Sequence, residues 1–289
     1  MKLGTEAHKV LFCQSFIDSH RQYEPEQLPW PQLDDVALER LRGIPFWEAA
    51  LETERQAGVM VKAFAETVDD PLIREAIALQ GYEENRHARL IEYMIRHYEI
   101  QITEPPPVAL PSNLKSEFLG FGYGECLDSF LAFGLFDIAR QSGFFPEALF
   151  TIFSSLLDEE ARHITFLVNW VAYSEVQQGR GNRVLRGVNS LWQYSRALRH
   201  LLGIVSNPDN GGEGFTATGA KTFMDDLTLE IFLSSSIQAN QRRMASVDER
   251  LLQPKLLPTL ASIALSFVRL MPNRQADKPA LPEEGLKTP

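Results

Sequence analysis

Cysteine is scarce in this chain of 289 residues, which holds only Cys13 and Cys126. A scaffold of several disulfides is therefore excluded, and so is a zinc site built from cysteines. Long apolar runs are missing as well, since none reaches the roughly 18 residues that a membrane-spanning helix needs. The N-terminal stretch lacks the apolar core and small-residue cleavage site of a signal peptide. We therefore expect no signal peptide, no membrane span and a cytoplasmic location.

Positive charge is also in short supply. The chain has 28 Lys and Arg residues against 38 Asp and Glu residues, a net charge of −10, which disfavours nucleic acid and anionic membranes as general partners. Apolar residues make up 44% and charged residues 23%, as in ordinary globular proteins. The length suits one large domain or two small ones. We expect no nucleic-acid partner, and a symmetric homodimer is the default assembly.

Helical periodicity dominates from residue 45 onward, and strand signals are nearly absent. Apolar and small residues three and four positions apart predict helices over 46–66, 71–98, 114–141 and 146–176. The stretch ITEPPPVALPSN cannot continue a helix, so it predicts a long connection between the second and third helices. Two antiparallel helix pairs joined by such a crossover form an all-α four-helix bundle.

The chain divides into four parts on this pattern. Residues 1–44 are mixed and show no long periodic segment, so they predict an N-terminal extension that packs on the core. Residues 45–178 form the bundle. Residues 179–272 predict additional helices that pack on it, separated by the loop NPDNGGEGFT. Residues 273–289 are polar and contain proline, and they predict a disordered tail.

A repeated motif carries the chemistry. The second predicted helix contains the sequence EENRH, and the fourth contains EEARH. Each embeds a Glu-x-x-His pair, Glu84 with His87 and Glu160 with His163, whose side chains project from one helix face a turn apart. Each pair interrupts an otherwise apolar stripe. Because buried carboxylates and imidazoles are costly unless they are paired or bind metal, these interruptions predict metal ligands.

The other two helices each offer one inward-facing glutamate. Glu54 lies on the apolar stripe of the first helix, and Glu125 lies on that of the third. Glu54 precedes Glu84 by 30 residues and Glu125 precedes Glu160 by 35, with a predicted turn near each midpoint. Each glutamate therefore lies at the depth of its partner motif in an antiparallel hairpin. The proposed ligand set is Glu54, Glu84, His87, Glu125, Glu160 and His163.

This order of residues resembles that of the ferritin-like di-iron carboxylate superfamily, which includes rubrerythrin, the ribonucleotide reductase small subunit, bacterial multicomponent monooxygenases and demethoxyubiquinone hydroxylase. The resemblance covers about residues 45–178 and implies a ferritin-like four-helix bundle. It also implies two bound iron ions, with Glu84 and Glu160 as bridging ligands and Glu54 and Glu125 as terminal ones.

The resemblance further implies a support for the ligand histidines. Glu83 and Glu159 stand directly before the ligand glutamates, where an acidic residue holds a ligand histidine across the bundle. Arg86 and Arg162 are expected to pair either with these two glutamates or with each other's helices. Four carboxylates suit oxygen-loving ions, and two imidazoles favour iron or manganese over magnesium. Manganese is therefore an alternative to iron in one or both positions.

The leading functional hypothesis is an oxidoreductase, an oxidase or monooxygenase that activates O2 at the dinuclear site. It would take electrons from a donor and oxidise or hydroxylate a small organic substrate, and the residues beyond a minimal bundle are numerous enough to build a substrate pocket. Three alternatives stay open. The chain could be a ferroxidase or other iron-handling protein, a hydroxylase acting on a tRNA base, or a non-catalytic bundle that uses metal as a structural clip.

Three further features lie outside the ligand set. Basic and apolar residues are interleaved over 183–200, which predicts a peripheral helix docked on the bundle, the alternative being contact with a membrane or an acidic carrier protein. Residues 256–271 are apolar but too short to span a bilayer, so a core, lid or dimer helix is expected. Gly120, Gly122 and Gly124 leave room above the metals or permit close helix packing.

Overall fold

The computed structural model describes residues 2–180, 182–205 and 227–270, and every regular element in these ranges is helical. The all-α class is therefore confirmed for the described part of the chain. In chain order the elements are α1 (Glu6–Asp18), the 3-10 turn η1 (Pro25–Gln27), α2 (Asp35–Arg42), α3 (Trp47–Glu66), α4 (Pro71–His97), α5 (Leu114–Gln141), α6 (Glu147–Gln177), α7 (Arg183–Val205), α9 (Leu229–Met244) and α10 (Leu256–Leu270). The ends of α3 to α6 differ from the predicted helix ends by no more than one residue.

Local capping signals set the ends of the long helices. The Asp70 carboxylate accepts hydrogen bonds from the backbone N–H groups of Leu72 and Ile73, and Pro71 occupies the first turn of α4. Asn113 caps α5 with its side chain in a similar way. These caps place the turn between α3 and α4 and the end of the long connection before α5. They therefore set the depth at which the residues of the two hairpins meet.

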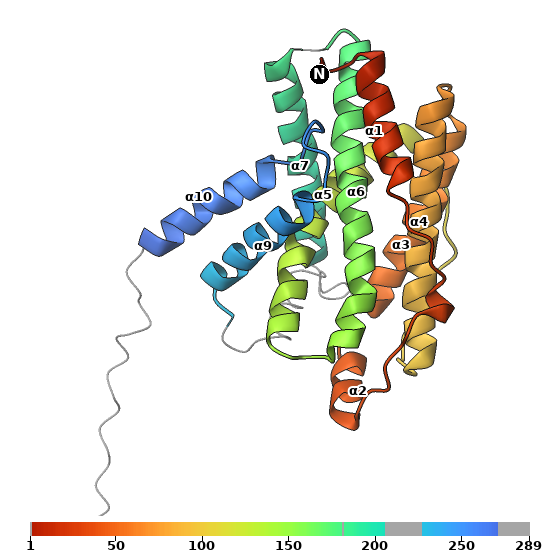
Figure 1. Cartoon of the computed structure of the whole chain (residues 1–289), viewed down its shortest axis with the longest axis vertical. Coiled ribbons are helices and arrows are strands. Elements are labelled where there is room, and N and C mark those ends of the chain that lie inside the picture. The colour runs from red at the N-terminus through yellow and green to blue at the C-terminus, as the bar shows by residue number, and fades with distance from the viewer. Residues whose placement is uncertain (1, 181, 206–226, 271–289) are drawn as a thin grey trace, which may run out of the picture.

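The four long helices α3 to α6 lie side by side, with α3 against α4 and α5 against α6 (Figure 1). Contacts also join α3 to α5 and α4 to α6, so the four helices share one interior. The backbones of α3 and α4 come close at Gly81, where a Cβ would lie only 2.9 Å from the backbone N of Lys62. Only glycine fits this approach, which keeps α3 within reach of the motif that begins two residues later on α4.

Residues 6–18 form a helix that the sequence, which showed no long periodic segment there, did not indicate. Helix α1 packs against α4 and α6 and buries Phe12 and Phe16. His8 and Lys9 are buried on the same helix, and the Lys9 ammonium forms an ion pair with the Asp70 carboxylate. Because the buried face mixes charged, polar and apolar side chains, its helical period is hidden in a hydropathy pattern.

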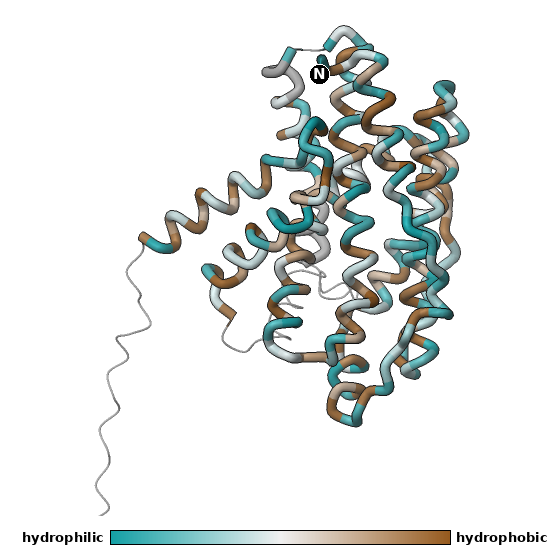
Figure 2. Tube along the Cα trace, viewed as in Figure 1, coloured by the Kyte–Doolittle hydropathy of each residue, from teal (hydrophilic) through white to brown (hydrophobic). Residues whose placement is uncertain are grey.

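The C-terminal helices pack on the outside of the four long ones. Helices α7 and α9 contact α5, and α10 contacts α9. Tyr194 of α7 meets Tyr123 of α5 edge to face, with 5.0 Å between ring centroids, while Trp192 remains exposed. Helix α10 extends away from the rest of the molecule (Figure 1). Its apolar residues are visible in Figure 2, and Leu260 and Phe267 are among those exposed.

Several expectations fall outside the described residues. They concern the loop at 207–216, the tail at 273–289 and the side chains at 183–186 and 200, which include part of the expected basic patch. Within the described ranges, no helix combines the length and apolar character needed to cross a membrane.

Two alanine substitutions test the close approach of α3 and α4. In Gly81→Ala the new methyl group would meet the Lys62 backbone N at 2.9 Å and its Cα at 3.2 Å, so the helices must separate at a cost of about 1–3 kcal/mol. In the control Gly120→Ala the methyl group meets nothing within 4 Å, and higher helix propensity should stabilise the fold by about 0.5–1 kcal/mol. Urea unfolding followed by circular dichroism measures both. A Gly81→Ala protein as stable as the wild type would contradict this packing.

Candidate metal centre

All six side chains proposed as ligands converge in the interior shared by the four long helices. Their N and O atoms form two overlapping groups, and within each group the atoms lie within 4.8 Å of one another. One group consists of Glu54, Glu84, His87 and Glu160, and the other of Glu84, Glu125, Glu160 and His163. The two groups share Glu84 and Glu160. The arrangement therefore offers two adjacent cation positions with two carboxylates between them.

The histidine Nδ1 atoms define the spacing within each group. His87 Nδ1 lies 3.1 Å from Glu160 Oε1 and 3.6 Å from an oxygen of Glu84. His163 Nδ1 lies 3.0 Å from Glu84 Oε1 and 3.7 Å from Glu160 Oε2. Ligand atoms that occupy neighbouring octahedral positions at about 2.1 Å from one ion lie about 3 Å apart. The side chains are thus already close to the separations that a shared cation requires.

Five buried atoms of this cluster have no hydrogen-bond partner among the described residues. They are Glu84 Oε2, His87 Nδ1, Glu125 Oε2, Glu160 Oε1 and His163 Nδ1. A buried polar atom left without a partner costs about 1–3 kcal/mol, and more when it is charged. His87 Nδ1 and His163 Nδ1 lie within ion-pair distance of Glu160 and Glu84, so these atoms face one another across one common space. Buried atoms from three helices that face one another without hydrogen bonds are the pattern expected of a ligand set.

The remaining nitrogen of each histidine is held by the opposite helix. His163 Nε2 on α6 lies 2.9 Å from Glu83 Oε2 on α4, and His87 Nε2 on α4 lies 2.9 Å from Glu159 Oε2 on α6. Burial acts to raise the pKa of Glu83, but the hydrogen bond and charge of His163 outweigh it and lower that pKa to about 2. An ionised carboxylate only accepts, so Nε2 donates the proton. The Nδ1 atom of His163 is therefore the one available to a cation.

The arginines of the two motifs also bond across the helices. Arg86 Nη2 donates to Glu159 Oε1 at 2.6 Å, and Arg162 Nη1 donates to Glu83 Oε1 at 3.0 Å. Arg86 lies farther from Glu83 on its own helix, at 3.9 Å. Each supporting glutamate thus accepts hydrogen bonds from the histidine and the arginine of the other motif. Arg86 and Arg162 thus pair with the two supporting glutamates, and each does so across to the other helix.

The N-terminal segment completes this support, and the sequence analysis missed its residues. His20 Nδ1 lies 2.6 Å from Glu83 Oε1, and the Tyr23 hydroxyl donates to Glu159 Oε2 at 3.2 Å. Arg86 also donates to the carbonyl oxygen of Arg21. No motif marks these residues, because they reach the site from an irregular segment rather than from a periodic helix face.

Gln80 is another residue that the sequence analysis did not assign to the site. Its Nε2 donates to Glu84 Oε1 at 3.2 Å from one turn earlier on α4. A spacing of four residues places both on one helix face, so this contact could have been found from the stripe. Of the glycines before Glu125, Gly122 packs closely on the side chain of Leu167, whereas a Cβ at Gly120 or Gly124 would meet no atom within 4 Å.

Burial and neighbouring charges shift the pKa values of the carboxyl groups in the cluster in opposite directions. Burial raises the pKa of Glu54 to about 8, although contact with His87 opposes the shift. Burial and the charge of Glu84 raise the pKa of Glu125 well above its usual value. Burial also acts to raise the pKa of Glu84, but the charge of His163 outweighs it and holds that pKa well below its usual range. Without a bound metal, the negative charge of the cluster is therefore reduced partly by protons that stay on its carboxyl groups.

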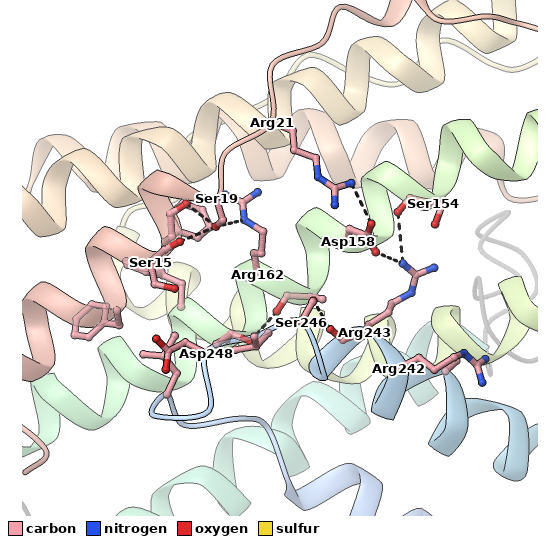
Figure 3. Close-up of a pocket in the computed structure, with 18 of the residues that line it drawn as sticks. Ser15, Ser19, Arg21, Ser154, Asp158, Arg162, Arg242, Arg243, Ser246 and Asp248 are labelled. Carbon is pink, nitrogen blue, oxygen red and sulfur yellow. Dashed lines mark hydrogen bonds and ion pairs between the residues drawn. The ribbon is translucent and has the colours of Figure 1, made fainter. Parts of the chain in front are cut away.

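A hollow beside the cluster reaches one of the proposed ligand side chains. A cavity of about 160 Å³ is lined by Glu54 and by apolar residues from the α2–α3 region and from α4, α5 and α6. A second hollow, a cleft of about 470 Å³, is shown in Figure 3. There Arg21 and Arg243 both donate to Asp158, at 3.1 and 2.5 Å, and Arg162 is engaged by Glu83. These arginines already have partners within the protein.

Comparison of the chain with models of protein families, with curated proteins and with solved structures found no match. The family resemblance therefore rests on the six motif positions and on the order of the helices that carry them.

Metal affinity is predicted to rise with pH through the neutral range. Glu54, with a pKa of about 8, and Glu125, with a raised pKa, hold protons at lower pH that a cation must displace. Burial acts to lower the pKa of His87 and His163, but the surrounding carboxylates outweigh it and raise the pKa of both, so the imidazoles also release protons when a cation binds. Raising the pH removes this competition, so the dissociation constant falls, and binding at neutral pH releases protons. Calorimetric titration with Mn²⁺ in two buffers of different ionisation enthalpy counts these protons. Binding at pH 7 without proton release would contradict the assignment.

Two tyrosine substitutions test whether the hydrogen bond from Tyr23 to Glu159, rather than ring packing on Arg86, contributes to metal binding. Tyr23 and Tyr82 both lie against the Arg86 guanidinium, at 4.0 and 5.6 Å from their ring centroids. The Tyr23 hydroxyl bonds to Glu159, whereas the exposed Tyr82 has no such bond among the described contacts. Tyr23→Phe is predicted to weaken metal binding by on the order of tenfold, and Tyr82→Phe to leave it unchanged. Equal affinities in a Mn²⁺ titration would remove Tyr23 from the site.

Proposed function

We propose that the four carboxylates and two imidazoles bind two metal ions, and that the chain is a ferritin-like, O2-dependent oxidoreductase. The observation that carries the proposal is the set of five buried ligand atoms that face one another without hydrogen-bond partners. Two overlapping groups that share Glu84 and Glu160 support a dinuclear centre. The long connection between α4 and α5 supports the ferritin-like order of helices.

The donor set favours iron or manganese. Carboxylate oxygens suit hard divalent ions, and one imidazole for each ion shifts the preference from magnesium toward iron and manganese. Two divalent ions would also neutralise the four negative charges of Glu54, Glu84, Glu125 and Glu160. Iron in both positions is the leading assignment, with manganese in one or both as the alternative.

Two iron ions held by these six residues would, when reduced, supply the electrons and open positions needed to activate O2. A monooxygenation consumes O2, two electrons and two protons, and it places one oxygen atom in the product and the other in water. A separate one-electron donor would provide the electrons. The residues of the chain hold the ligands in place: Glu83 and Glu159 fix the imidazoles through Nε2. The apolar cavity beside Glu54 excludes water and provides a space for an organic substrate.

The lining of this cavity also bears on the three alternative functions. A ferroxidase needs a polar route for iron ions, whereas apolar residues surround the route to Glu54 through this cavity. A tRNA base is polar and belongs to a strongly anionic chain, which matches neither this lining nor the net charge of −10. A non-catalytic bundle with a structural metal would bind the same ions, so only a reaction with O2 separates it from an oxidase. A homodimer stays a prediction.

Protein produced with iron supplied is expected to contain about two iron ions per chain. Glu160→Ala is predicted to lose both ions, because Glu160 belongs to both ligand groups. Glu125→Ala removes a ligand from one group only and should retain about one ion. Glu117→Ala, an exposed position on the same helix, is the control and should retain both. Iron is measured by elemental analysis and helix content by circular dichroism. Full iron content in Glu160→Ala would overturn the site.

The reaction with O2 is tested on the same preparation. Reduced protein mixed with O2 is expected to show a transient absorption band in the near-ultraviolet or visible range. Uptake of iron far beyond two ions per chain on continued exposure would favour an iron-handling protein instead. Bound iron that gives no optical change with O2, together with loss of stability when the iron is removed, would identify the metal as a structural clip.

A further inference from the structure

The cavity of about 160 Å³ beside Glu54 differs in kind from the rest of the site. Seventeen residues line it, and sixteen of these are Ala, Leu, Ile, Phe or Trp. Glu54 is the exception among them. The indole N–H of Trp47 is not available to the cavity, because it donates to the carbonyl oxygen of Leu41 at 2.9 Å. The cavity is therefore an apolar space with one polar point, which is a side chain of the proposed metal centre.

The lining shows that the cavity begins at the cluster. Ala50 lies one turn before Glu54 on α3, Ile91 one turn after His87 on α4, and Leu157 one turn before Glu160 on α6. The Glu54 side chain keeps 18% of its surface accessible, against 1% for Glu84. Glu54 is therefore the ligand side chain whose open surface adjoins this space.

The cavity is elongated along the helices. On α6 its lining extends from Leu157 back to Leu149, which at a rise of 1.5 Å per residue is about 12 Å along the axis. Buried Leu41 and Ile44, from the end of α2 and the segment after it, contribute to its wall. Other parts of the wall, such as Phe145, are partly exposed, and these mark the entrance.

We infer that this cavity binds the hydrocarbon part of the substrate, a straight chain of about six carbons that ends beside Glu54, and the inference rests on the proposed function. An apolar cavity of about 150 Å³ holds one benzene molecule, which sets the six-carbon size. The length of the lining along α6 favours a chain over a ring. A charged group inside would lose its hydration without gaining a partner, so the polar end of the substrate lies at the partly exposed entrance.

Straight-chain primary alcohols from propanol to decanol test the inference by binding alone. Each methylene group that enters the cavity is expected to tighten binding by up to about fourfold, and the gain should stop near six carbons, where the space is full. Ligand-observed NMR titration of the Mn²⁺-loaded protein measures the series, and the metal content of every sample is measured in parallel. Benzene is included as a ring with the same number of carbons.

Two variants locate the binding. Ala132→Leu adds three carbons to the wall of the cavity, so the gain in affinity should stop about three carbons earlier. Ala148→Leu adds the same atoms at an exposed position outside the lining and should behave as the wild type. Ala50→Leu, nearer to Glu54, is the second filling variant and decides the matter if Ala132→Leu does not fold.

The outcomes separate the cavity from the metal centre. A plateau near six carbons in the wild type, shifted in the filling variants only, supports the inference. Protein that holds its metal but shows no dependence on chain length, or the same plateau in the filling variants, overturns it and leaves the proposed function standing. Benzene that binds more tightly than hexanol overturns the straight-chain assignment. Chain-length dependence in a protein that binds no metal overturns the proposed function, and with it the role of the cavity as a substrate site.

Discussion

The structure depends on one electrostatic constraint, the burial of four carboxylates in two overlapping groups whose N and O atoms lie within 4.8 Å of one another. Such a cluster is unstable unless opposite charges, protons or metal ions compensate it. The nearest compensation comes from His87 and His163, and these are fixed in turn by Glu83 and Glu159. Arg86 and Arg162 neutralise that second pair of glutamates. With two divalent cations in the centre, the four ligand carboxylates and the two glutamate–arginine pairs carry no net charge.

This constraint explains the role of each polar residue in the repeated motif. In each copy, the second glutamate and the histidine face the centre. The first glutamate accepts a hydrogen bond from the histidine of the other copy. The bonds join Glu83 to His163 and Glu159 to His87, so the order of residues along one helix runs opposite to that along the other. Such reciprocal bonding is satisfied only when α4 and α6 are antiparallel. The motif thus encodes the relative direction of two helices as well as a set of proposed ligands.

The sequence predicted the helices and the convergence of the six ligand side chains because both follow from short-range periodicity. Glu84 and His87 are one turn apart, and the hairpin spacing places Glu54 at the same depth. His20 and Tyr23 could not be found in this way, since an irregular segment brings them to the site from about 60 residues or more away in the chain. Helix α1 escaped prediction because its buried face includes His8 and Lys9. The cavity beside Glu54 depends on packing between several elements, which no local pattern records.

The surroundings of the cluster give it two different sides. On one side, Glu83 and Glu159 hold the imidazoles by hydrogen bonds, and His20 and Tyr23 bond in turn to those two glutamates. Exchange of ligands or entry of substrate on this side would therefore require charged hydrogen bonds to break. On the side of Glu54 the wall is apolar and holds a cavity, and a molecule that enters breaks no polar contact. Rigid support on one side and an apolar space on the other are what a reactive centre needs, because ligand geometry is preserved while one face remains accessible. A purely structural metal clip would gain stability from closing both sides, and the cavity at Glu54 is the feature that such a role leaves unexplained.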